Sequence, residues 1–200
     1  MEIQIRDVVI MQLETVGHFD DKPIARFREL LSQSIETELD HLHKAVEEAR
    51  AKPEASRIEQ QMVASFMDDE SYFLEEAQEL ADSLSISALY SRLEITIKRL
   101  CRIGISGTKS RGLFKFEKIA DRFLTVGVDL KNLPEYQTID ELRCLNNAIK
   151  HEGKAGPELT KYGWRVGDPI KGISDSYSRF ENGCRLFVDS LREELIRVQP

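Results

Sequence analysis

Long hydrophobic runs are absent from this sequence. No apolar stretch approaches the roughly 18 residues that a membrane-spanning helix requires. Residues 1–14, MEIQIRDVVIMQLE, mix charged and apolar side chains, whereas a cleaved leader places a basic segment before an apolar one. We therefore expect neither a membrane span nor a leader.

Cysteine, glycine and proline are also scarce. The three cysteines, Cys101, Cys144 and Cys184, are far apart, with neither a CxxC pair nor a histidine at zinc-finger spacing. They indicate free core thiols in a reducing compartment, so we expect a cytoplasmic protein without a metal or other cofactor. Only 11 glycines and 6 prolines interrupt the 200 residues, which favours long helices.

Apolar residues recur at three- and four-residue steps through most of the chain, and strict alternation is confined to residues 2–8. The sequence therefore predicts an all-α protein, a helical bundle with an additional N-terminal helical region. We assign the N-terminal segment and a long helix to residues 1–53 and the bundle to residues 54–200, and expect one continuous domain. The predicted helices cover residues 23–50, 54–103, 113–126, 138–153 and 174–198.

Three boundaries depend on particular residues. The serine-rich residues 83–87 predict a bend, because serine hydroxyls compete for backbone hydrogen bonds. Thr138 followed by Glu141 predicts a capping box that begins a helix, and Gly153 is expected to end it. Trp164, the single tryptophan, is expected to anchor the loop that follows this helix to the bundle, although its ring could also stack on a base.

The net charge of −7 is unevenly spread. Residues 98–122 hold eight basic and two acidic residues, a local charge of +6 on an otherwise acidic chain. Such a segment can bind a phosphate-bearing partner, or it can simply form solvated helix faces. The candidate RNA-binding residues are Lys98, Arg102, Lys109, Arg111, Lys115, Lys150 and Lys154.

The most informative stretch is ELRCLNNAIKHEG, residues 141–153. At about 100° per residue, Arg143, Asn147 and His151 form a row beside the apolar side of the predicted helix. A histidine can exchange a proton near pH 7, an arginine can hold phosphate oxygens, and an asparagine can orient either group. We therefore take these three residues as the candidate catalytic set.

A structural interpretation of the same stretch stays open. Arg143 can pair with a neighbouring acid, Asp140 or Glu141, while His151 caps the end of the helix, where a cation is favoured. Asn146 lies on the apolar side, so we expect it to be buried and hydrogen-bonded.

The segment LRCLNNAIKHEG resembles the signature helix of the HEPN superfamily, whose members are helical bundles. In that family the helix ends in a polar residue, three further residues and a histidine, which Asn147, Lys150 and His151 match. Residues 88–100 also resemble the long helix of such bundles, with Glu94 in its middle as a structural polar residue. The resemblance covers roughly residues 70–197.

This resemblance implies a metal-independent RNA endonuclease acting as a homodimer, in a bacterial toxin, stress or phage-defence setting. In active members, histidine and arginine side chains of both subunits promote attack of the ribose 2′-hydroxyl on the adjacent phosphate. The family's arginine position is Asn146 here, and Arg143 stands one helical turn earlier. The alternative is therefore a non-catalytic helical module that dimerises, or binds a partner protein or RNA.

Overall fold

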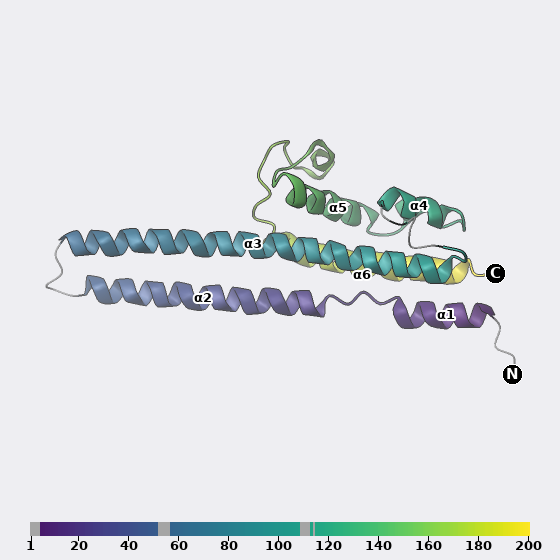
Figure 1. The fold of residues 1–200 in the computed structure, drawn as a ribbon, viewed down its shortest axis with the longest axis horizontal. Coiled ribbons are helices and arrows are strands. Elements are labelled where there is room, and N and C mark those ends of the chain that lie inside the picture. Colours follow the sequence, from purple (N-terminus) through teal and green to yellow (C-terminus); the bar gives the residue numbers. More distant parts are fainter. Residues whose placement is uncertain (1–4, 52–56, 109–112, 114) are drawn as a thin grey trace. The chain divides into compact units, whose positions relative to one another are not determined.

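The computed structural model describes all residues except 1–4, 52–56, 109–112 and 114. The described residues form six α-helices and three short 3-10 helices, and their single β-bridge joins Lys154 to Pro169. This confirms the all-α prediction. Figure 1 labels the six α-helices. The α-helices are α1 (Ile5–Val16), α2 (Lys22–Arg50), α3 (Arg57–Gly104), α4 (Phe116–Leu124), α5 (Tyr136–His151) and α6 (Tyr177–Arg197), and the 3-10 helices are η2 (Leu130–Asn132), η3 (Pro157–Tyr162) and η4 (Ser174–Ser176).

The chain divides into two compact units. The bundle unit comprises residues 1–21 and 86–200, and the hairpin unit comprises residues 22–85. This division differs from the expected boundary at residue 53. The physical reason is that the N-terminal segment packs on the last helix, where Arg185 pairs with Asp21 at 3.0 Å.

The core of the bundle unit is built from helical stripes. On α3, Leu89, Leu93, Ile97 and Leu100 recur at three- and four-residue steps and are at most 1% exposed. Stripes of α4, α5 and α6 complete this core, and α5 packs against α6. Their fully buried members include Ile119, Phe123, Ile139, Leu142, Leu145, Phe180, Phe187 and Leu191.

The hairpin unit has almost no interior. It consists of α2 and the first part of α3, and its buried side chains, Ala81, Asp82 and Ser85, lie at one end. There Arg28 of α2 pairs with Asp82 of α3 at 3.3 Å. Over the rest of the described hairpin every side chain is exposed or half-buried, because two helices can cover only the faces that they turn toward each other.

The predicted bend at residues 83–87 is wrong, because α3 runs unbroken through them. Ser85 is buried, and its hydroxyl donates to the carbonyl of Ala81 one turn earlier, at 2.7 Å. A serine that bonds back within its own helix satisfies its hydroxyl without displacing the backbone ladder.

The predicted capping box of α5 is also wrong. The helix begins at Tyr136 after Glu135, and the Thr138 hydroxyl donates to the Glu135 carboxylate at 2.7 Å. Glu141 turns away from the helix start to meet other partners. The predicted end is correct, since Gly153 adopts φ 64° and donates its backbone N–H to the carbonyl of Ala148 at 2.8 Å.

The three cysteines are free and buried, as expected of core thiols. In the bundle unit they belong to α3, α5 and α6. None of the helices in the described ranges combines the length and apolar character that crossing a membrane requires.

The neighbours Leu186 and Phe187 on α6 provide a matched test of this core. Phe187 is fully buried and Leu186 is 45% exposed. We expect Phe187→Ala to lower the free energy of unfolding by about 3–5 kcal/mol, because a cavity replaces the ring. Leu186→Ala should cost about 0.5 kcal/mol or less. Urea unfolding followed by circular dichroism measures both, and equal losses would contradict this packing of α6.

Candidate functional site

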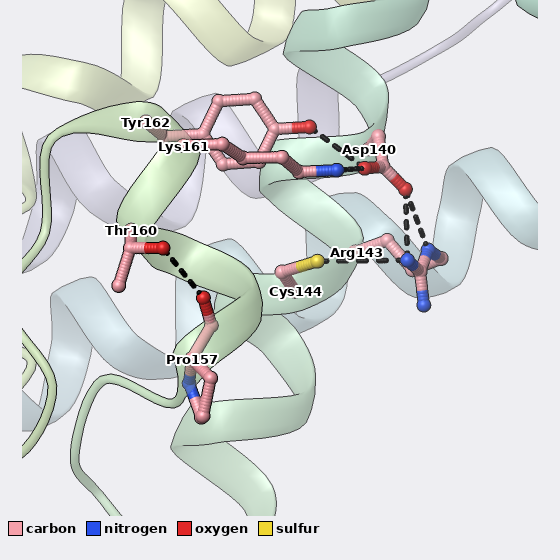
Figure 2. A network of polar contacts seen from close by, with 7 residues as sticks. All are labelled: Asp140, Arg143, Cys144, Pro157, Thr160, Lys161 and Tyr162. Carbon is pink, nitrogen blue, oxygen red and sulfur yellow. Dashed lines mark hydrogen bonds and ion pairs between the residues drawn. The ribbon is translucent and has the colours of Figure 1, made fainter.

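The candidate stretch on α5 is organised by a buried carboxylate, that of Asp140, which is 5% exposed. Its Oδ1 accepts hydrogen bonds from Nε and Nη2 of Arg143, at 3.0 and 2.8 Å. Its Oδ2 accepts from Lys161 Nζ at 2.5 Å and from the Tyr162 hydroxyl at 2.7 Å (Figure 2). One carboxylate therefore holds three side chains from two segments of the chain.

The next residue, Glu141, is a second buried acid, 7% exposed. Its carboxylate accepts from Arg179 Nη1 at 2.8 Å and from the Trp164 indole at 3.5 Å. Through this contact Trp164 anchors its loop to α5, as predicted. Together the two acids attach residues 157–164 and the start of α6 to α5.

The electrostatics of Asp140 follow from these contacts. Burial alone would raise the pKa of its carboxyl, but hydrogen bonds from Lys161, Tyr162 and Arg143 outweigh burial and lower the pKa to about 2. In turn, the hydrogen bond to Asp140 raises the pKa of Lys161. Asp140 is thus a charged, fully occupied anchor at neutral pH.

Arg143 belongs to this anchor. Burial lowers the pKa of its guanidinium, while the hydrogen bond and charge of Asp140 raise it above its ordinary value. The side chain is 23% exposed, lies 3.5 Å from the Cys144 sulfur, and stacks over the Phe116 ring at 5.8 Å. The part of the structural interpretation in which Arg143 pairs with a neighbouring acid is confirmed, whereas no contact of the His151 side chain with the described residues shows that it caps the helix.

Asn147 and His151 lie differently, because both are exposed, as are Lys150 and Lys154 nearby. No hydrogen bond or ion pair joins these four side chains to the part of the chain that the structure describes. His151 is eight residues beyond Arg143 on α5, which is about 12 Å along the helix axis at 1.5 Å per residue. The backbone positions of Arg143 and His151 are therefore about two helical turns apart.

Asn146 stands where the HEPN resemblance places an arginine. It is 2% exposed, so the prediction that it is buried is confirmed. The predicted hydrogen bonding is wrong for its carboxamide oxygen, which has no partner among the described residues. Asn146 is thus buried within the bundle unit and is not exposed on its surface.

The basic candidates outside α5 have varied surroundings. Lys98 is half-buried and pairs with Glu94 at 2.9 Å, so part of its charge is neutralised within α3. Arg102 and Lys115 are exposed. Lys109 and Arg111 lie outside the described residues. Between them and α3, the loop is held by Arg122, which donates to the Ser106 carbonyl at 2.8 Å and to the Thr108 hydroxyl at 3.0 Å.

No family model, curated protein or solved structure matches the chain. Within the ranges that the structure describes, no three His, Cys, Asp or Glu side chains gather in a group that could hold a metal ion. The function of this site is therefore inferred from its own geometry.

Sequence reasoning missed the roles of Lys161, Tyr162 and Arg179. The available signal was the adjacent pair Asp140 and Glu141 between the apolar residues Ile139 and Leu142, since buried acids require partners. The sequence marks those acids as needing donors, but it does not say which distant segment supplies them.

Because the pKa of Asp140 is low, the contribution of this residue to the free energy of unfolding depends on pH. A carboxyl whose pKa falls from 3.8 unfolded to about 2 folded stabilises the protein above pH 4, and loses this effect between pH 4 and pH 2. The shift corresponds to about 2 kcal/mol. We expect Asp140→Asn to be less stable than the wild type at pH 7, with a difference that shrinks toward pH 2. Urea unfolding from pH 7 to pH 2 measures it.

The matched control is Asp121→Asn on α4. Asp121 is 66% exposed and pairs with Lys118 at 3.7 Å, so its replacement should change stability little at any pH. If the free energies of unfolding of the wild type and Asp140→Asn differ by the same amount from pH 5 to pH 2, the Asp140 network is not the source of that difference.

Proposed function

We propose that this protein is a helical interaction module of HEPN-like architecture, which works by docking a partner and not by cleaving RNA. The observation that carries the proposal is a row of exposed apolar residues on the hairpin unit, here called the α3 stripe. Its members are between 53% and 68% exposed. They are Ile58, Met62, Phe66, Phe73, Leu80 and Leu84.

The spacing of the α3 stripe is that of a packing face. At about 100° per residue its six members fall within an arc of about 80°, and they extend about 39 Å along the helix. An apolar stripe of this regularity normally lies against another helix. Isolated exposed apolar residues need no explanation, whereas a row of them along one face of a helix indicates an interaction surface.

The geometry of α5 supports docking over catalysis. Catalysis of the HEPN type needs an arginine and a histidine directed at one phosphate. Asn146 faces the interior, Arg143 is held by Asp140, and His151 lies about 12 Å further along the helix. Nε and Nη2 of Arg143 are already bonded to Asp140 and Cys144, which leaves Nη1 as the nitrogen with N–H groups for a phosphate.

A metal-independent RNA endonuclease in a toxin, stress or phage-defence setting is the second candidate function. The observation that favours it is the exposed end of α5, where Asn147, Lys150 and His151 are unpaired within the described chain. A homodimer with these ends facing each other would let His151 remove the ribose 2′-hydroxyl proton, while Lys150 and Arg143 attract the phosphate.

Incubation of the purified protein with total RNA and a metal chelator distinguishes the two functions. For a docking module we expect no cleavage above background and identical RNA profiles for the wild type and His151→Ala. Cleavage by the wild type that falls about 10²-fold or more in His151→Ala would instead establish the ribonuclease, because general acid–base catalysis contributes effects of that size. A similar loss of RNA cleavage in Arg143→Ala would show that Arg143 also takes part in the reaction.

Photo-cross-linking tests the docking function directly. Phe73 is replaced by benzoylphenylalanine in the cells that naturally make the protein, and the matched control carries the same residue at Val166, which is 61% exposed but off the stripe. We expect one discrete protein adduct from position 73 and none from position 166. No adduct at either position would contradict a docking function, and the adduct's mass identifies the partner.

A further inference from the structure

The side chains around the α3 stripe are strongly acidic. Residues 57–85 contain eight acids and a single base, a net charge of −7. Five of the acids are exposed, whereas Asp82 is buried and paired with Arg28. The exposed ones are Glu59, Asp68, Asp69, Glu75 and Glu76.

Two of these acids lie within the stripe itself. Asp69 precedes Phe73 by four residues and Glu76 follows it by three, so their carboxylates flank the ring on the same helix face. No described cation pairs with either one, and Glu76 only accepts a hydrogen bond from the Tyr72 hydroxyl at 2.7 Å. The centre of the stripe is thus an exposed phenyl ring between two uncompensated negative charges.

This charge arrangement opposes a second copy of the chain as the occupant. In a parallel pairing of two α3 stripes, Asp69 would face Asp69 and Glu76 would face Glu76. In an antiparallel pairing about the stripe's midpoint near residue 71, Asp69 of each copy would lie about one turn from Glu76 of the other. Both arrangements bring carboxylates together as apolar groups exclude water, which weakens association.

We propose that the α3 stripe binds a basic amphipathic helix of a partner protein. This proposal rests on the docking function above and names the partner's chemistry. The partner would present apolar side chains at three- and four-residue steps to Phe66, Phe73 and Leu80, and lysine or arginine to Asp69 and Glu76.

The dimensions of the surface suit such a helix. A stripe about 39 Å long corresponds to about 26 residues of partner helix at 1.5 Å per residue. Six large side chains, each more than half exposed, offer on the order of 600 Å² of apolar surface. Together with the exposed acidic side chains around the stripe, this area approaches the roughly 800 Å² that each partner contributes to a stable interface. The added helix would cover the face of α3 that α2 leaves exposed.

The experiment uses the full chain and three fluorescein-labelled synthetic peptides of about 28 residues. One carries leucine on one helical face and lysine elsewhere, the second has glutamate for every lysine, and the third scrambles the first. Fluorescence anisotropy measures binding. We expect the leucine–lysine peptide to bind, with a Kd that rises at least about tenfold from about 50 mM to about 500 mM salt. The other two peptides should bind at least about tenfold more weakly.

Variants of the protein separate the apolar and charged contributions. Phe73→Ser should weaken binding of the leucine–lysine peptide at least about tenfold, as expected of a central anchor. The double variant Asp69→Asn, Glu76→Gln should weaken it at low salt and flatten its salt dependence. The matched control Val166→Ser, an equally exposed apolar site off the stripe, should bind like the wild type. Circular dichroism checks that all variants remain helical.

Three outcomes would overturn the inference. They are equal binding of the lysine and glutamate peptides, a Phe73→Ser variant that binds like the wild type, and sedimentation of the wild type as a dimer that Phe73→Ser dissociates. The last outcome would make a second copy the occupant and leave the docking function intact. Failure of the docking function itself would appear separately, as the absence of any adduct from position 73 in the cross-linking experiment.

Discussion

The arrangement of the bundle unit around α5 depends on the burial of the Asp140 carboxylate. A carboxylate removed from water is costly unless charged or hydrogen-bonding partners surround it. Asp140 gathers Arg143 from its own helix and Lys161 and Tyr162 from η3, so a connecting segment becomes a fixed part of the bundle unit. Glu141 likewise forms a hydrogen-bonded ion pair with Arg179 of α6. Two adjacent acids thereby decide where the chain after α5 runs.

The same interaction limits what α5 can do chemically. An arginine that completes a buried ion pair contributes to stability, and only its nitrogens outside that pair remain for a phosphate. Arg143 is committed to Asp140, and Asn146 faces the core, whereas His151 extends into solvent at the helix end. This separation of roles along one helix is why a docking function agrees better with the geometry than catalysis within one chain does.

The hairpin unit differs from the bundle unit, because its two helices bury few side chains and leave apolar side chains exposed to solvent. Phe66 and Phe73 would be core residues if a third helix lay against them. The negative charges on either side of Phe73, Asp69 and Glu76, then restrict which helix that can be. In the proposed docking function, the apolar side chains would supply the contact area and the negative charges would select the partner.

Local pattern in the sequence determined the helices that follow α1, their limits at Gly153 and near Lys22, the burial of Asn146 and the pairing of Arg143 with a neighbouring acid. Each of these follows from interactions between residues a few positions apart, such as helical periodicity and an i, i+3 ion pair. Tertiary structure alone decided that Glu141 leaves its capping role for Arg179, and which face of α3 remains exposed. Those outcomes depend on partners distant in the chain, whose position no local pattern specifies.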